Sequence, residues 1–212
     1  MHIEATSTLV TLDAEGYLSE YSLKRNSHRP KLARINNFQP SQLANYRLDY
    51  NEFNSVLCLS SGSLIYIVGY PNGTNTQRCI DIDEGRLGLS IDCLKFSADG
   101  VRLAVCLSNQ SDFTAPNQVR IYAVPTVGVT YDLLQSIDYE SSAASPGGDD
   151  SSMPPLARVT SLDWSKDSEY LRFTTSDFRK FYVKRHWNEE ASARERSETY
   201  EIDNYCMHAL LA

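Results

Sequence analysis

The sequence lacks the features that would make it a membrane or a secreted protein. Its longest apolar runs, such as residues 64–68, are far shorter than the roughly 20 apolar residues that a membrane-spanning helix needs. Its first residues, Met1-His2-Ile3-Glu4-Ala5, have neither the basic start nor the apolar core of a secretory signal. We therefore expect a protein of the cytoplasm or cytoskeleton with no membrane partner.

Cysteine is sparse and its spacing shows no pairing. The chain has 5 cysteines and no Cys-x-x-Cys pair, which argues against both a disulfide framework and a thiolate zinc site. We expect buried free thiols at the five positions, which are Cys58, Cys79, Cys93, Cys106 and Cys206.

Catalytic signatures are absent as well. The 4 histidines are scattered, and the sequence contains no His-Glu-x-x-His, no nucleophile elbow and no glycine-rich phosphate loop after a strand. We expect no enzymatic activity, no catalytic residue, no metal and no cofactor.

Basic residues are outnumbered, yet they gather in one place. The 20 Lys and Arg residues against 27 Asp and Glu give a net charge of −7, which argues against nucleic acid as the main partner. Residues 24–47 nevertheless contain six basic residues and no acidic one, so the rest of the chain has 14 basic and 27 acidic residues. The candidate partner-binding residues are Lys24, Arg25, Arg29, Lys31 and Arg34. The alternative to a partner-binding site is that these residues form a solvated loop between blades.

What the chain of 212 residues does contain is short runs of β-forming residues with period-2 alternation. Residues 9–12 and 17–21 flank Asp13-Ala14-Glu15-Gly16, which predicts a β-hairpin. Residues 55–59, 64–70 and 77–82 predict three further strands, separated by turn sequences. The pattern favours an all-β protein with many antiparallel strands. Residues 24–54, which include Pro30 and Pro40, fit this pattern least.

Two segments of the sequence repeat each other without a gap. Residues 94–103 align with residues 162–171 at an offset of 68 positions, and both continue into a matching strand, at residues 119–124 and 178–183. A propeller repeat measures only about 40–45 residues. The excess is explained by residues 140–155, which are small, polar, acidic and rich in Ser, Pro and Gly, and which we expect to form a disordered loop insertion.

At these residues the sequence resembles WD-repeat β-propellers. Phe96-Ser97-Ala98-Asp99-Gly100 and Trp164-Ser165-Lys166-Asp167-Ser168 are similar to the turn that joins two strands of a propeller blade. The aromatic residue would anchor between blades, and Asp with Gly would close the turn. No Gly-His and no Trp-Asp dipeptide occurs, so the buried network that those dipeptides form in standard blades must be absent or rebuilt.

Within the WD-repeat proteins, the sequence is most similar to the echinoderm microtubule-associated protein-like family. The resemblance rests on residues 103–122, on residues 159–177 with their Leu-Asp-Trp-Ser and Ser-Asp motifs, and on residues 201–206, which read Glu-Ile-Asp-Asn-Tyr-Cys. It covers residues 90–206 well and residues 7–82 only generically. Membership would imply a propeller that associates with microtubules.

The predicted architecture is a partial β-propeller over residues 1–212. Blade remnants are expected at residues 7–23, 44–82, 90–124 and 159–183, and another blade is expected to start at residues 200–212. A closed seven-bladed ring needs about 280 residues. Further blades would therefore come from the same or another chain.

The resulting hypothesis is a non-enzymatic scaffold that binds tubulin, microtubules or axonemal proteins. We expect it in the cytoplasm or the cytoskeleton, where the cilium or flagellum is one possible site. The basic stretch would contact the acidic tubulin surface. One alternative is a WD-repeat adaptor in an unrelated protein complex. Another, from a different functional class, is a hydrolase with its site in the central channel of a propeller.

Overall fold

The computed structural model describes residues 2–3, 7–35, 37–40, 46–70, 78–82, 88–109, 117–125, 130–139, 158–187 and 198–207. All regular elements in these ranges are β-strands. Within them, no helix has the length and hydrophobicity needed to cross a bilayer.

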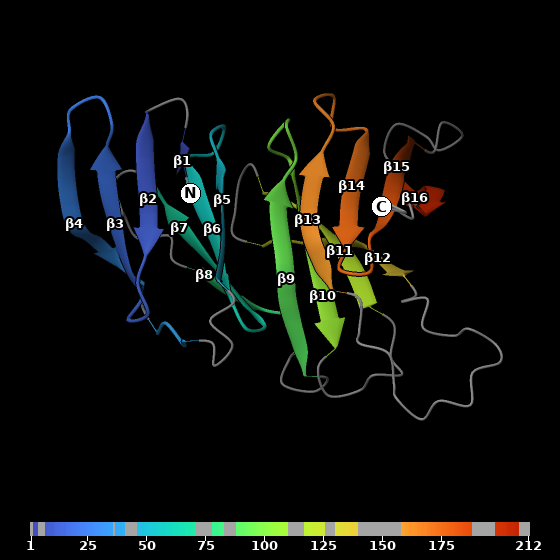
Figure 1. Cartoon of the computed structure of the whole chain (residues 1–212), viewed down its shortest axis with the longest axis horizontal. Coiled ribbons are helices and arrows are strands. Elements are labelled where there is room, and N and C mark those ends of the chain that lie inside the picture. Colours follow the sequence, from blue (N-terminus) through green and yellow to red (C-terminus); the bar gives the residue numbers. More distant parts are fainter. Residues whose placement is uncertain are drawn as a thin grey trace, which may run out of the picture. The chain divides into compact units, whose positions relative to one another are not determined.

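The strands form two compact units, residues 1–86 and 87–212, and each unit contains two four-stranded antiparallel sheets. In every sheet the strands follow one another in chain order, so each strand pairs with its neighbours in sequence (Figure 1). The first unit consists of β1 (His2–Ile3), β2 (Thr8–Leu12), β3 (Tyr17–Ser22) and β4 (Ser27–Arg34), and of β5 (Tyr46–Asn51), β6 (Val56–Ser61), β7 (Leu64–Gly69) and β8 (Arg78–Asp81). The second consists of β9 (Leu89–Phe96), β10 (Arg102–Asn109), β11 (Asn117–Ala123) and β12 (Leu133–Tyr139), and of β13 (Val159–Trp164), β14 (Tyr170–Thr175), β15 (Arg179–Trp187) and β16 (Glu198–Met207).

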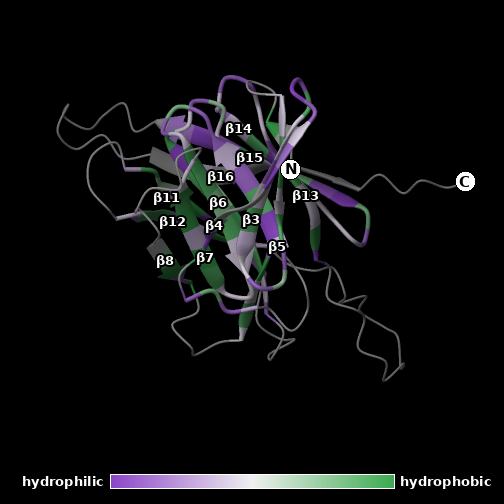
Figure 2. Ribbon diagram, turned by 90° about the vertical axis from the view of Figure 1, so that its left-hand side faces the viewer, coloured by the Kyte–Doolittle hydropathy of each residue, from purple (hydrophilic) through white to green (hydrophobic). Residues whose placement is uncertain are grey.

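The first unit is held together by apolar side chains that its two sheets direct at each other. Val10 and Leu18 from the first sheet pack with Leu57, Leu59 and Tyr66 from the second, and all five are at most 2% exposed. The strands β6 and β7 are hydrophobic along most of their length (green in Figure 2). Period-2 alternation in β2 and β3 directs one side of each strand into this core, which is the pattern that the sequence shows.

The core of the second unit is rich in aromatic rings. Phe173 of β14 and Phe181 of β15 are stacked, with ring centroids 4.6 Å apart and an interplanar angle of 10°. Tyr139 of β12 lies 5.0 Å from the ring of Phe173, so the sheet β9–β12 and the sheet β13–β16 meet at this cluster. These contacts account for the burial of the aromatic residues in the predicted strands.

The repeated sequence segments form the same turn in both sheets of the second unit. Ser97 donates a hydrogen bond to Asp99 with an O···O distance of 2.5 Å, and Ser165 donates to Asp167 with the same distance. The hydroxyl of each serine also accepts a backbone N–H five residues later, at 3.0 Å and 2.9 Å. The offset of 68 positions in sequence is therefore a repeat in structure.

The position that closes this turn is held by different residues in the two copies. Gly100 has a φ of +71°, and Ser168 has a φ of +61°. Ser168 is completely buried, and its Oγ accepts the backbone N–H of Asp99 at 3.0 Å, so the turn of one sheet is tied to the turn of the next. This bond offsets part of the strain of a positive φ at a residue that has a side chain.

The outermost strands are where the structure differs from the sequence-based expectation. β4 lies in the region of residues 24–54, where the sequence pattern gave the least support for a strand. Pro30 can lie within this strand because it falls at a bulge, since Glu20 pairs with Arg29 whereas Leu18 pairs with Ala33. Proline is tolerated at bulges and on outer strands, where its missing N–H removes no ladder bond. The first sheet therefore extends beyond the remnant predicted at residues 7–23.

The end of the chain also differs. The sequence predicted that residues 200–212 begin another blade, but Glu198–Met207 pairs with β15 over nine residue pairs and is the fourth strand of the last sheet. That expectation rested on the resemblance of residues 201–206 to a family segment that enters the next blade, whereas here these residues pair with the strand that precedes them. Residues 208–212 and the predicted loop insertion at residues 140–155 lie outside the described residues.

The described cysteines are free thiols. Cys58, Cys93 and Cys106 are buried as expected, and burial raises the pKa of Cys58 and of Cys106. Cys79 is exposed, which corrects the expectation for that position, because it lies on the outer strand β8. The side chain of Cys206 is outside the described part.

Two glycines with positive φ offer a matched test of packing in the first unit. At Gly16, with a φ of +82°, an added Cβ would lie 2.6 Å from Cγ of Phe38, whereas at Gly62, with a φ of +64°, it would meet nothing within 4 Å. We expect Gly62→Ala to lower the free energy of unfolding by about 1 kcal/mol, from backbone strain alone. Gly16→Ala should cost about 1–2 kcal/mol more, because it also overpacks the turn against the ring. Urea denaturation followed by circular dichroism compares the two, and equal losses would show that Phe38 moves aside freely.

Candidate functional site

A groove of about 340 Å³ opens on the first unit at the end where β3 turns into β4. Both of its sheets contribute, since Thr8 lies on β2 and Tyr70 follows β7. We call it the basic groove, and it is lined by Thr8, Glu20, Ser22, Lys24, Arg25, Ser27, Arg29 and Tyr70.

Strand register explains how these polar side chains come together. Thr8 pairs with Ser22, which pairs in turn with Ser27, so three hydroxyl residues form one row across β2, β3 and β4. Glu20 and Arg29 pair in the next row. Alternation places both rows on the side that Val10 and Leu18 also face, so the inner face of the sheet changes from apolar to polar toward the end at which β3 turns into β4.

The tight turn of residues 23–26 places two further cations at the rim of the groove. Asn26 has a φ of +47°, which lets the chain reverse within a few residues. The backbone N–H of Arg25 donates to Oγ of Ser22 at 3.4 Å. Lys24 and Arg25 are both exposed.

The lining of the groove has a net positive charge, and its cations form no ion pairs with the described residues. In the described part of the chain, the side chains of Lys24, Arg25 and Arg29 form no ion pair. Glu20 is the one acidic residue of the lining. Burial and the negative charge of Glu20 raise the pKa of Tyr70 to about 12, so this phenol keeps its proton at neutral pH. Three cations against one carboxylate make the groove suited to anions.

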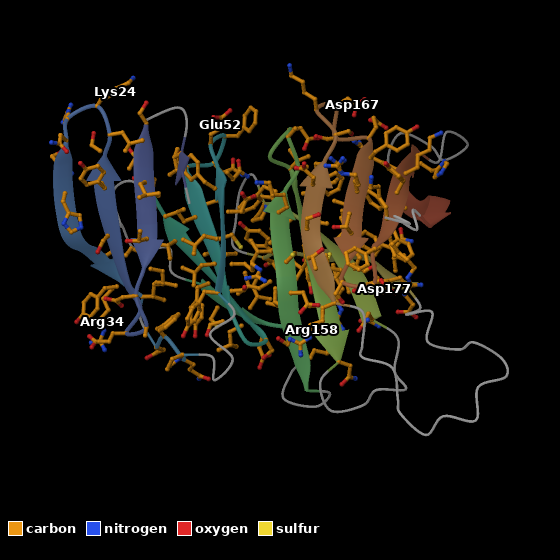
Figure 3. The ribbon with its side chains drawn as sticks, in the orientation of Figure 1. Lys24, Arg34, Glu52, Arg158, Asp167 and Asp177 are labelled. Atoms are coloured by element: carbon orange, nitrogen blue, oxygen red, sulfur yellow. The ribbon has the colours of Figure 1, made fainter. Side chains whose placement is uncertain are left out.

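The structure divides the predicted basic stretch. Lys24, Arg25 and Arg29 meet in the basic groove, but Arg34 lies at the opposite end of β4 (Figure 3), with its guanidinium 5.3 Å from the ring centroid of Tyr17. Lys31 belongs to β4, and its side chain is outside the described part. The stretch is thus a strand and its turn rather than a single basic loop.

The sequence analysis missed the hydroxyl residues of the groove. Ser22 and Ser27 flank the turn symmetrically, which is the one signal that could have placed them beside the cations. Tyr70 comes from another sheet, 41 positions after Arg29 in the sequence, and no local pattern could have assigned it.

A second group of charged residues, in the second unit, forms ion pairs within its own turns. Arg102 Nη1 lies 2.9 Å from Oδ2 of Asp99, and Arg179 Nε lies 2.6 Å from Oδ2 of Asp177. Burial by itself would raise the pKa of Asp99, but hydrogen bonds from Ser97 and the Val101 amide, together with the charge of Arg102, hold the pKa below its ordinary value. We interpret these groups as structural. No three His, Cys, Asp or Glu side chains in the described ranges are grouped so as to hold a metal.

Comparison with known proteins places the fold. No model of a known protein family matches the chain, and no curated protein matches it. Among solved structures, the β-propeller domain of Cps50 (Swd1) from Myceliophteria thermophila is similar, with a TM-score of 0.54 and 14% sequence identity over 95% of this chain and 55% of that one. A chain of the complex of KlAtg21 with the coiled coil of AgAtg16 is similar with a TM-score of 0.53 and 11% identity, over 87% of this chain and 58% of that one.

These likenesses concern the fold alone, and they confirm the prediction of an all-β fold of the β-propeller type. The chain spans little more than half the length of the two propeller structures that it matches. The four four-stranded antiparallel sheets formed by the described residues correspond to a partial set of propeller blades.

Proposed function

We propose that this chain is a non-enzymatic β-propeller scaffold that associates with microtubules, in the cytoplasm and cytoskeleton and including the axoneme of cilia or flagella. The observation that carries the proposal is the basic groove, in which three cations without ion pairs gather on a chain of net charge −7. Such a local reversal of charge steers an acidic partner surface and fixes its orientation. The sequence resemblance to the echinoderm microtubule-associated protein-like family supports tubulin as that partner.

The geometry of the groove indicates which of the predicted contact residues would face the partner and which would not. Lys24, Arg25 and Arg29 would face the acidic partner, whereas Arg34 lies at the other end of the sheet and would not. Attraction between exposed charges is screened beyond about 8 Å at physiological salt, so residues at the groove should dominate.

Co-sedimentation of the chain with stabilised microtubules tests the proposal. We expect pelleting at low salt, a loss of binding as salt increases, and about tenfold weaker binding when Lys24, Arg25 and Arg29 are all changed to Gln, because rim charges contribute mainly through long-range attraction. A matched control changes Arg172, Lys180 and Lys184 of the last sheet to Gln, which removes the same charge from a different unit. Absence of pelleting at low salt, or equal losses in the two triple variants, would contradict it.

A WD-repeat adaptor in an unrelated complex is the second candidate. It is favoured by the likeness to the complex of KlAtg21 with a coiled coil, since that structure is of a protein bound to a helical partner. Proximity labelling in cells separates the two candidates, because an adaptor would label neither tubulin nor other cytoskeletal proteins.

A further inference from the structure

We infer that the basic groove binds the phosphate of a phosphorylated side chain in a partner protein. This inference rests on the proposed function in one respect, namely that the groove is the surface on which a partner docks. It adds the chemical group that the groove recognises.

The donors that line the groove suit phosphate better than carboxylate. Arg25 and Arg29 supply planar guanidinium groups, Lys24 supplies an ammonium group, and Ser22 and Ser27 supply hydroxyl groups. A phosphate monoester carries a charge of about −1.5 to −2 at pH 7 and three acceptor oxygens, so it can use several of these donors at once. A single carboxylate has two oxygens and one charge, and it would leave part of the donor set without an acceptor.

The donors surround one concave space and do not form a flat patch. Thr8 and Tyr70 are 3% and 5% exposed and line the space from β2 and from the end of β7, whereas Lys24 and Arg25 stand at its rim. Ser22 and Ser27 pair across β3 and β4, so their positions are fixed by the sheet. Because the sheet already holds these hydroxyl residues in place, they lose little conformational entropy when an anion enters the groove.

The surroundings of the groove favour a peptide over a membrane surface. Leu23 and Phe53 are 53% and 64% exposed, and their turns lie at the same end of the unit, near Lys24 and Glu52 in Figure 3. They offer apolar contact to residues that flank a phosphorylated side chain. Glu20 inside the groove and Glu52 beside Phe53 would repel an anionic bilayer, whereas a peptide can direct N–H donors at them.

Binding of peptide libraries to the full chain tests the inference. The libraries share a fixed central position that carries phosphoserine, serine or glutamate, and fluorescence anisotropy reports their binding. We expect the phosphoserine library to bind at least about tenfold more tightly than the other two, because hydrogen bonds to charged groups are each worth about that factor. Inorganic phosphate should compete.

Variants assign the effect to the groove. We expect Arg29→Gln to weaken phosphopeptide binding about tenfold and Arg29→Lys to restore part of it, since Lys keeps the charge but not the planar donor pair. Arg34→Gln, on the same strand but at its other end, should leave binding unchanged. Unchanged thermal unfolding of each variant shows that it is folded.

Three outcomes would overturn the inference: equal binding of the three libraries, equal effects of Arg29→Gln and Arg34→Gln, or binding to vesicles that contain phosphoinositide without binding to the phosphopeptides. Its failure is distinct from failure of the proposed function. Microtubule pelleting without phosphoserine preference would remove only the inference, and phosphoserine preference without pelleting would remove only the microtubule role.

Discussion

Replacing Phe173 with alanine is expected to lower the free energy of unfolding of the second unit by about 3–5 kcal/mol. The side chain is fully buried, stacks on Phe181 at 4.6 Å and contacts Tyr139 from the neighbouring sheet, so truncation opens a cavity at the point where the two sheets meet. Both tryptophans of the chain, Trp164 and Trp187, lie in this unit, so tryptophan fluorescence during urea denaturation reports on it selectively.

The matched control for this substitution is Phe178→Ala. Phe178 is 78% exposed and has a φ of +63°, so its removal takes little apolar surface out of a core. We expect a change within about 0.5 kcal/mol. If the two variants unfold at the same urea concentration, then the aromatic cluster does not hold the unit together.

Replacing Asp92 with leucine is expected to destabilise the second unit by about 4 kcal/mol. The carboxylate is 2% exposed, accepts a hydrogen bond from Oγ of Ser108 at 3.0 Å, and accepts the backbone N–H of Val159 at 3.3 Å. Leucine has no acceptor, and each buried donor that loses its partner costs about 1–3 kcal/mol. The bond to Val159 also joins β9 to β13, so the two sheets would lose a polar tie.

The conservative control is Asp92→Asn, which keeps one acceptor oxygen and nearly the same volume. We expect it to cost about half as much as Asp92→Leu, as measured by the same fluorescence transition. Hydrogen exchange of the Val159 amide gives an independent reading, because its protection should fall in the leucine variant. A leucine variant as stable as the wild type would show that apolar packing replaces the hydrogen bonds at this position.

The sequence predicted the middle strands of the sheets well and missed several of the outer strands, for a physical reason. β6, β7 and β10 have a strand on each side and bury most of their residues, so their sequences are rich in apolar residues. β12 is exposed at several positions and lies at the outer margin of its sheet, so its sequence carries little of the alternation that identifies a strand. β4 and β16 also lie at the outer margins of their sheets.

The candidate site was predictable in its charge but not in its shape. The acid-free stretch from Lys24 is visible in the sequence, and three of its five candidate residues do line one groove. The position of the turn at residues 23–26 decides which cations meet, and it sends Arg34 to the far end of β4. The contribution of Tyr70 depends on packing between two sheets, which no local pattern encodes.

The tie between the two repeated turns limits how independently the blades can be engineered. The backbone N–H of Asp99 donates to the hydroxyl of Ser168. Copying the first turn onto the second would place glycine at position 168, as at Gly100. This change would relieve the backbone strain of the positive φ but leave the N–H of Asp99 without its acceptor. The two turns, although copies of one sequence pattern, are therefore not interchangeable modules. A designer who transplants either sheet into another propeller has to transfer Asp99 and Ser168 together, because the hydrogen bond needs both residues.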